Sequence, residues 1–503
     1  MLERPLIWGA LSTAAAAALL AACAVGPDFQ RPAAPQIAGY TGEPALPAQT
    51  AGSQVEHGDA QEFQVGSALQ RQWWTLFRSE PLDRLIEQAL KDSPTVASAQ
   101  ATLRQAREEL AAERGATWPA VNGQASVQRE QFTGALFGQG GTSVFTLYNT
   151  SVNVSYPLDL FGSIRRQLEA LQAQVDSADY QLQATYLALT SNLATTAIRE
   201  ASLRAQIQAD EELEKLQEDG LRIVEQRFNL GAVTRSNVLA QRTALAQTRA
   251  LLPGLQRQLA QVRHQLSLYA GQPPEAPALP SFELEGLQLP LQLPVSVPSD
   301  LVRQRPDILS AEALLHAASA RVGVATAALY PQITLSGNIG TEALTPGALF
   351  KHDSTVWGIG PSLLAPIFSG GQLQANRREA IAAFDAAAAN YRQTVLAAFA
   401  SVADALRALE ADALALQAQA EAQHQAREAF EMASRQFHVG AVSYLTLLNT
   451  QQQLQQTRIA VVQAQADRFA DTVALFGALG GGWWNDAHAN ATDELTGPTD
   501  GTN

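Results

Sequence analysis

The chain contains one pattern twice. RFNLGAVT at 227–234 recurs as QFHVGAVS at 436–443, 209 residues later. A second pair keeps this spacing, because YPLDLFG has its proline at 157 and APIFSGG has its proline at 366. A fixed spacing between similar segments indicates internal duplication, which constrains the architecture before any local pattern does. Each half has the order strand, strand, very long helix, glycine turn and helix. We therefore expect one body built from two similar halves.

Composition and periodicity bound the segments of this body. The expected order is a signal peptide at 1–22, a lipidated tether at 23–70, a first repeat at 71–270, a Pro-rich crossover at 271–300, a second repeat at 301–484 and a disordered tail at 485–503. Each repeat is expected to hold a β-hairpin, at about 119–161 and about 331–368. A long helix and a return helix follow each hairpin.

Charge and reactive residues exclude several classes of function. A formal net charge of −14 argues against a nucleic-acid partner, which would need a basic surface. None of the three lysines follows a glycine, so the chain has no phosphate-binding loop of the Walker type. The seven histidines lack metal-ligand spacing, and a single cysteine excludes a thiolate site. We expect no cofactor, no metal site and no enzymatic activity.

The single cysteine has a definite context. Residues 1–22 have Arg4 followed by an apolar run that is too short for a stable membrane span, as in a secretory signal. The run ends LLAAC at Cys23, which resembles the site where bacterial lipoproteins are cleaved and acylated. Ala24 follows, and by the usual lipoprotein sorting pattern this favours the outer membrane. Several acyl chains on Cys23 would make a stable anchor.

Two regions alternate apolar and polar residues with the period of a β-strand. Strands are expected near 121–128 and 151–156, and again near 332–339 and 357–363. Strands of roughly ten residues can cross a bilayer when tilted. Two matched hairpins beside a lipid anchor favour transmembrane strands over a soluble sheet, although each strand alone would fit either.

Helical periodicity takes over after Gly162 and continues to Asn229. Apolar residues spaced by seven are typical of coiled-coil packing. They are Leu168, Val175, Leu182 and Leu189, then Leu216, Ile223 and Leu230, and in the second half Val395, Val402, Leu409 and Leu416. A helix of some 68 residues would be about 100 Å long, too long for a globular core, so these helices must pack along one another.

Four strands cannot close a barrel by themselves. An open sheet edge inside a bilayer leaves backbone groups unpaired at a cost of several kcal/mol each, and single-chain barrels start at about eight strands. The strand edges must therefore pair with other copies of the chain. A dimer would give eight strands and a trimer twelve.

Several motifs together resemble the outer-membrane factor family, the TolC, OprM and NodT group, in its lipoprotein branch. They are the lipobox at Cys23, QWWTLF at 72–77, YPLDLFG, PIFSGG, RPD at 305–307 and LGGGWW at 479–484. The resemblance implies an internally duplicated α plus transmembrane β fold, whose homotrimer forms a twelve-stranded barrel and a twelve-helix periplasmic tunnel. It further implies an outer-membrane, lipid-anchored exit duct that takes substrates from an inner-membrane pump through a periplasmic adaptor.

The resemblance also implies two sites. The glycine turns match the tips where an adaptor hairpin docks, namely Leu230, Gly231, Ala232, Val439, Gly440 and Ala441. Close to these tips, family members often carry pore-facing aspartates. The matching positions are Asn237, Thr446 and Asn449, all uncharged, so this periplasmic gate is expected to close by packing and hydrogen bonds.

Other functions remain open at this stage. Within the channel class, small-drug efflux competes with metal export and with type I protein secretion. With two methionines in the chain, no soft-metal path is visible. Outside that class, a periplasmic coiled-coil lipoprotein that tethers envelope layers would share the helices and the anchor, but it would not need two alternating hairpins.

Overall fold

The computed structural model describes residues 24–35, 37, 39–42, 45–133, 141–274 and 279–485. Cys23, the expected signal peptide and nearly all of the expected tail lie outside the described residues. The chain divides into two compact units, one formed by 1–32, 102–179 and 310–392, and the other by the remainder. The helices α3 (Pro94–Gly115), α4 (Ser163–Asn229), α7 (Pro306–Ala327) and α8 (Gln372–His438) contribute residues to both units.

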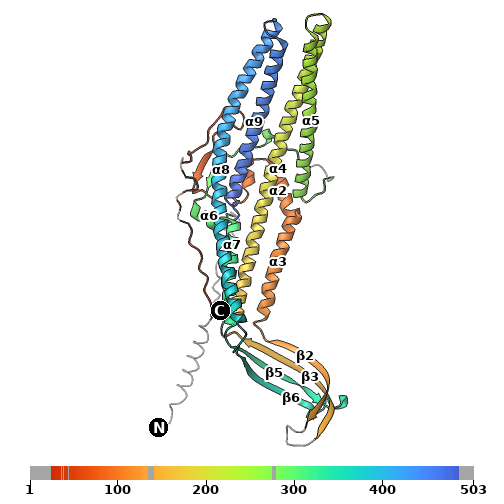
Figure 1. Cartoon of the computed structure of the whole chain (residues 1–503), viewed down its shortest axis with the longest axis vertical. Helices are drawn as coiled ribbons and strands as arrows, with labels where there is room; N and C mark the ends of the chain where they lie inside the picture. Colours follow the sequence, from red (N-terminus) through yellow and green to blue (C-terminus); the bar gives the residue numbers. More distant parts are fainter. Residues whose placement is uncertain are drawn as a thin grey trace, which may run out of the picture. The chain divides into compact units, whose positions relative to one another are not determined.

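The first unit contains a single four-stranded antiparallel sheet (Figure 1). Its strands are β2 (Ala120–Thr133), β3 (Thr142–Leu158), β5 (Gln332–Ala343) and β6 (Thr355–Leu364), in the order β2-β3-β5-β6. The short 3-10 turns η4 (Pro346–Ala348) and η5 (His352–Ser354) connect β5 to β6. Each edge of the sheet, β2 and β6, therefore has one side unpaired among the described strands.

The register assigns each side chain to one face of the sheet, since the pairing runs without a break along every strand. One face carries Val121, Val127, Val152, Val154, Leu335, Ile339, Trp357, Ile359 and Leu363, each between 37% and 74% exposed in the single chain. The other face carries Asn122, Gln124, Ser126, Asn149, Ser151, Asn153, Thr334, Asn338 and Ser362. The alternation expected from the sequence is thus present in the sheet.

The start of the described chain is docked within this unit. Val25 donates its backbone N–H to the carbonyl of Phe161 at 3.1 Å. The side chain of Arg166, on α4, is nearly buried and pairs with Asp28 at 2.6 Å. Residues 24–32 therefore lie against the point where β3 is followed by α4.

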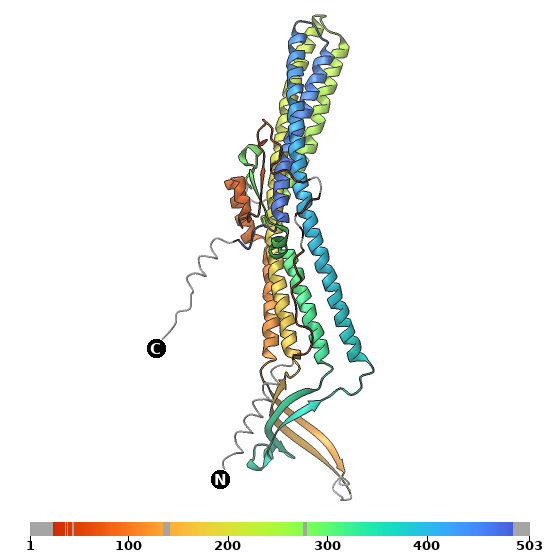
Figure 2. The same ribbon diagram turned by 90° about the vertical axis from the view of Figure 1, so that its left-hand side faces the viewer.

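The second unit is dominated by two helical hairpins. The long helix α4 turns back into α5 (Arg235–Tyr269), and α8, of the same 67-residue length as α4, turns back into α9 (Tyr444–Ala478). The two hairpins lie side by side in both views (Figures 1 and 2). The long helices contain no proline, whereas α5 accommodates Pro253.

The seven-residue apolar repeats are buried along most of their length but not everywhere. Val395, Val402, Leu409 and Leu416 on α8 are all buried, and so are Val175, Leu182 and Leu189 on α4. Leu216, Ile223 and Leu230 are instead 56%, 49% and 83% exposed. These last three residues keep the coiled-coil spacing but are exposed in the described part of the chain.

Short elements surround the hairpins in the second unit. They are β1 (Glu62–Val65), η1 (Trp73–Phe77), α2 (Glu80–Asp92), η3 (Leu284–Gly286), β4 (Gln292–Val295) and α6 (Pro298–Gln304). Strand β1 pairs in parallel with β4. Fully buried Gln61 donates to the carbonyl of Pro290 and to the hydroxyl of Thr472. The segment expected as an extended tether is therefore fastened to α9 and to the crossover segment.

Among the described residues, α7 is the one helix whose length and composition would allow it to cross a membrane. Within the protein, 61% of its apolar window is buried. That burial is typical of a core helix, so α7 is weak evidence for a membrane-spanning helix.

Candidate docking tips and gate

The two helix ends at the glycine turns have the same backbone geometry. Gly231 and Gly440 have φ of +73° and +75°, a left-handed conformation that favours glycine. At the first tip Ala232 N–H bonds the carbonyl of Arg227 at 2.8 Å, and Gly231 N–H bonds that of Phe228 at 2.9 Å. This pair of bonds is the Schellman motif, which satisfies the last carbonyls of a helix.

The second tip repeats the motif with equivalent partners. Ala441 N–H bonds the carbonyl of Gln436 at 2.9 Å, and Gly440 N–H bonds that of Phe437 at 3.1 Å. The residues just before the two glycines, Leu230 and Val439, are 83% and 80% exposed. Each turn thus presents an apolar side chain to the outside on a rigid backbone.

Two of the expected gate residues lie in the first turns of the return helices. The N-cap of α9 is Ser443, whose hydroxyl accepts from Thr446 N–H at 3.2 Å and contacts the Thr446 hydroxyl at 2.9 Å. At the equivalent place on α5, the hydroxyl of Thr234 lies 3.3 Å from the side-chain oxygen of Asn237. Thr446 therefore takes part in capping α9, whereas Asn237 contacts the side chain of the N-cap residue Thr234 with no side-chain cap bond to the α5 backbone. Asn449 is exposed, one turn further along α9.

Below the turns, a small apolar cluster joins the two hairpins. It consists of Val224, Val238 and Tyr444, with partly buried Leu221, Val233, Phe437 and Leu447 around it. The guanidinium carbon of Arg227 lies 4.9 Å from the centre of the Phe437 ring, within the range of a cation–π contact. The tips are held by a few aromatic and aliphatic contacts.

A buried hydrogen-bond chain runs through this cluster. The hydroxyl of Tyr444 donates to the side-chain oxygen of Gln241, and the amide of Gln241 donates to the carbonyl of Gln217 at 2.7 Å. Burial raises the pKa of Tyr444 to about 12, so the hydroxyl stays protonated as a donor. A Cβ at Gly220 would lie 3.3 Å from the Gln241 amide, which leaves little room for a larger residue there.

Polar contacts continue along α4 and α9. Gln463 donates to Gln206 at 3.2 Å, and Gln455 donates to buried Asp210 at 3.0 Å. Burial raises the pKa of Asp210, and the bond from Gln455 opposes that rise. These partly buried polar pairs help to align the two helices, because a shift would break both hydrogen bonds. These pairs could not be predicted from the sequence, because glutamines are common along both helices and nothing distinguishes the ones that pair.

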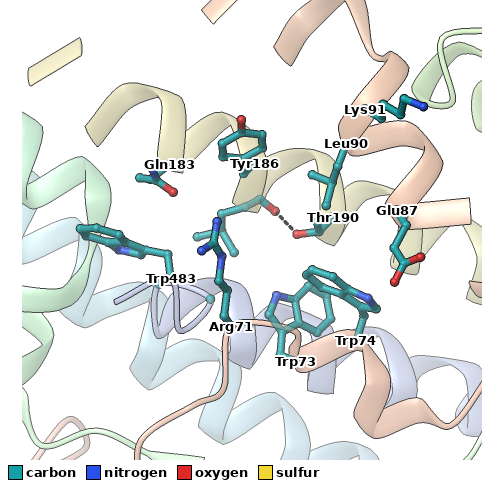
Figure 3. Close-up of a pocket in the computed structure, with 13 residues that line it drawn as sticks. Arg71, Trp73, Trp74, Glu87, Leu90, Lys91, Gln183, Tyr186, Thr190 and Trp483 are labelled. Atoms are coloured by element: carbon teal, nitrogen blue, oxygen red, sulfur yellow. Dashed lines mark hydrogen bonds between the residues drawn. The ribbon is translucent and has the colours of Figure 1, made fainter. Parts of the chain in front are cut away.

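The two tryptophan motifs meet around a pocket of about 340 Å³ in the second unit (Figure 3). Trp73, Trp74 and Trp483 line it together with Arg71 and Tyr186. The C-terminal segment enters the pocket region through Gly480, Gly481 and Gly482, all of which have positive φ. A Cβ atom added to Gly482 would lie only 2.4 Å from the carbonyl oxygen of Leu69. The glycine run therefore serves close docking of the C-terminal segment.

Among the described residues, no group of three or more His, Cys, Asp or Glu side chains is placed to hold a metal ion. The predicted tip residues lie at the two turns, and the predicted gate residues lie on the first two turns of the helices that follow. Cys23 lies outside the described residues.

Comparison with known proteins identifies the family. The model of the "Outer membrane efflux protein" family matches residues 85–272 and 297–481. The chain belongs to this family. Its sequence is 30% identical over 482 residues to the toluene efflux pump outer membrane protein TtgC of Pseudomonas putida, covering 94% of this chain and 96% of TtgC. It is 30% identical over 467 residues to the cation efflux system protein CusC of Escherichia coli O6:H1, covering 92% and 96%.

A solved structure agrees with these relatives. The outer-membrane channel OprN superposes with a TM-score of 0.81 at 28% identity, over 92% of this chain and all of that one. The prediction of an outer-membrane efflux channel from the sequence motifs is therefore confirmed. Members of this family are channel proteins rather than enzymes.

Proposed function

We propose that three copies of this chain form a transmembrane barrel and a helical tunnel, which together are the exit duct of a tripartite efflux system. The observation that carries the proposal is the four-stranded sheet, with one apolar face exposed and both edge strands unpaired. An inner-membrane pump would deliver the substrate, and a periplasmic adaptor would join the pump to the duct.

The sheet supports assembly through its edges. Strands β2 and β6 each leave a row of backbone groups without partners in the described chain. Inside hydrocarbon such groups cost several kcal/mol each, so β2 of one copy must pair with β6 of the next. Three copies supply twelve strands, with the apolar face toward lipid and the amide-rich face toward the lumen.

The helices support assembly as well. Leu216 and Ile223 follow the coiled-coil spacing on α4 and remain about half exposed. Burying a leucine side chain contributes about 1.5–3 kcal/mol, and a helix of a neighbouring copy would supply that burial. These two residues thus extend the contact between copies along α4.

The helix turns are proposed as the adaptor docking site. Leu230 with Gly231 and Ala232, and Val439 with Gly440 and Ala441, form two matching apolar knobs on Schellman turns. A glycine at each turn lets another backbone approach closely. Three copies would present six such turns to an adaptor.

The gate is proposed at the first turn of α5 and the first two turns of α9, with Asn237, Thr446 and Asn449 uncharged. Closure would then depend on the apolar cluster and on the Tyr444–Gln241 hydrogen bond rather than on repelling or metal-bridged carboxylates. Such a gate would respond little to divalent cations.

Lipidation of Cys23 is proposed from LLAAC and from the docking of the next residue. Ala24 packs closely against Gly162, because a Cβ atom added to Gly162 would lie 2.9 Å from the Cα and Cβ atoms of Ala24. Ala24, the residue after Cys23 in the sequence, lies beside the turn between β3 and α4. Mass spectrometry of the mature N-terminus tests this, and an unmodified residue would contradict it.

The cargo is proposed to be a small molecule or ion chosen by the pump. The relatives' names include toluene for TtgC and cations for CusC, so similar chains are named for different cargoes. The test uses a host from which the gene for this protein and those of equivalent channels are deleted. Supplying this protein from a plasmid should restore resistance only when a matching adaptor and pump are present.

Assembly is tested directly by native mass spectrometry and cross-linking. A cysteine at Ser126 on β2, combined in turn with one at Gly358, Gly360 or Ser362 on β6, should give covalent dimers and trimers at one register. The control pairs Ser126→Cys with Gly254→Cys on α5 in place of a cysteine on β6. This pair should give no covalent dimers or trimers. A protein that is monomeric or dimeric in mild detergent would contradict the trimeric duct.

A further inference from the structure

Charged side chains are rare on the four strands of the described sheet. Arg129 and Glu130 lie on β2, Glu342 lies on β5, and β3 and β6 carry none. Since side chains alternate, Arg129 shares the apolar face with Val127, whereas Glu130 lies on the opposite face with Ser126. The positive charge and the nearest negative charge therefore point to opposite sides.

Glu342 lies on the same polar face as Glu130. Its register partner is Asn149, which pairs in turn with Ser126 on β2. The amide of Asn149 donates to the Oε1 atom of Glu342 at 2.8 Å, which holds the carboxylate against the neighbouring strand. Glu342 is the penultimate residue of β5, so it lies at the loop end of the sheet. The opposite ends of the strands lead to the helices.

We propose that Glu342, assisted by Glu130, makes the outer part of the pore selective for small cations over anions. This inference rests on the proposed trimeric barrel, in which the polar face lines the lumen. Three copies would then place three Glu342 carboxylates at one level, with three from Glu130 nearby. Rings of carboxylates confer cation selectivity on channels, and a low-dielectric wall focuses their field.

The remainder of the polar face offers no competing charge. Asn122, Gln124, Asn153, Asn338 and Ser362 are neutral amides and a hydroxyl. The three proposed gate positions are uncharged too. Selectivity is therefore assigned to the barrel, at residues separate from both the gate and the docking tips.

Coulomb's law gives the size of the effect. Three charges about 10 Å from the pore axis, in water and screened over a Debye length of about 10 Å, enrich monovalent cations about twofold and deplete anions about twofold. The permeability ratio of potassium to chloride should therefore be about fivefold at about 0.1 M salt. It should approach one at about 1 M, where the Debye length falls to about 3 Å.

Reversal potentials of the purified full-length protein in planar bilayers, under a potassium chloride gradient, test the inference. Glu342→Gln should lower the ratio about twofold or more, Glu342→Lys should shift it toward chloride, and Glu130→Gln should lower it less. Arg129→Gln changes charge by one unit on the opposite face and is the matched control, with the ratio expected to remain unchanged.

The outcomes separate this inference from the proposed function. A native trimer that conducts without preferring potassium at low salt would overturn the inference and leave the duct intact. The same holds if Glu342→Gln and Glu130→Gln both conduct with the native ratio. If Glu342 variants fail to insert, the low-salt and high-salt ratios of the native protein and the Glu130→Gln ratio decide. A native protein that forms neither trimers nor conducting pores would overturn the duct itself.

Discussion

Tyr444 donates its hydroxyl proton to the side-chain oxygen of Gln241, and this bond joins the first turn of α9 to the second turn of α5. Both side chains are buried, at 7% and 1% exposure. The repeat offset of 209 places Arg235 where Tyr444 stands and Thr450 where Gln241 stands, so the first half of the chain has no equivalent bond. The duplicated hairpins are therefore fastened asymmetrically.

Tyr444→Phe should loosen the tips. The change keeps the ring but leaves the buried oxygen of Gln241 without its donor, which costs about 1–3 kcal/mol. Amide hydrogen exchange should accelerate in the first turns of α9 and in α5 around Gln241, and single-channel conductance should rise. Thr243→Val on the exposed face of α5 is the control. Native exchange rates in Tyr444→Phe would show that the bond does not hold the hairpins together.

Gly440→Trp should block efflux without dissociating the trimer. Its φ of +75° disfavours any side chain, and a large ring on an exposed turn would keep an adaptor at a distance. Drug susceptibility of the host and trimer content on gels measure the two effects separately. Gly254→Ala is the control, because Gly254 lies inside α5 and an added Cβ would meet open space. This variant should stabilise the folded protein by about 0.5–1 kcal/mol and keep full drug resistance. Full resistance with Gly440→Trp would remove this turn from the docking site.

The strand phase predicts unequal effects for two arginine substitutions. Ile359 lies on the apolar face and Asn338 on the polar face. Ile359→Arg should cost about 2–4 kcal/mol near the bilayer midplane, whereas Asn338→Arg should be milder because it faces the lumen. The folded fraction, read from heat-modifiable migration after refolding into lipid, gives the comparison. Equal losses would mean that the faces are assigned wrongly.

Asp412 should make stability depend on pH. Burial raises its pKa to about 7, and the neighbouring carboxylates of Asp471 and Asp467 add to the rise. Between about pH 4 and 7 the folded protein keeps a proton that the unfolded chain has released, so the free energy of unfolding falls as pH rises through that window. The loss should be about 1–2 kcal/mol, after allowing for the partial exposure of the group.

Asp412→Asn should remove this dependence. The amide cannot ionise, so the variant's apparent melting temperature should fall less than the native value between pH 5 and pH 8. Asp404→Asn replaces an exposed carboxylate on the same helix and is the control. A native and an Asp412→Asn curve that remain parallel would show that Asp412 does not titrate in this range.

The sequence predicted the elements of this fold better than their surroundings. Strand alternation and the absence of proline from the two long helices are local properties, and the structure has the strands and helices where those patterns place them. Exposure of Leu216 and Ile223 could not be read from spacing, because the same period marks a residue packed within the chain and one that packs on another copy. The fastening of Gln61 to α9 joins segments about 400 residues apart, a distance at which periodicity carries no information.

The candidate site, too, was predictable from the sequence only where the signal is local. Gly231 and Gly440 were predictable because only a left-handed turn needs glycine between two such helices. The capping role of Thr446 could have been predicted from Ser443 three residues earlier, because a serine at an N-cap accepts from the backbone three residues on. Tyr444 and Gln241 were unpredictable, since a tyrosine and a glutamine 203 residues apart give no sign that they meet.

The gate prediction is tested most cleanly at Asn449. Thr446 and Asn237 make contacts at the helix caps, so an acid at either place would alter the helix start as well as the pore. Asn449 is exposed one turn later, and Asn449→Asp adds charge with little change of shape. In a three-fold pore the substitution adds three carboxylates to a constriction, which concentrates cations.

Multivalent cations applied from the periplasmic side should block the native channel weakly and the Asn449→Asp channel strongly, with the block weakening as salt rises. Asn449→Gln, which keeps the amide, is the control and should behave like the native channel. Strong block of the native channel that Asn449→Asp leaves unchanged would place the cation-binding constriction elsewhere in the duct.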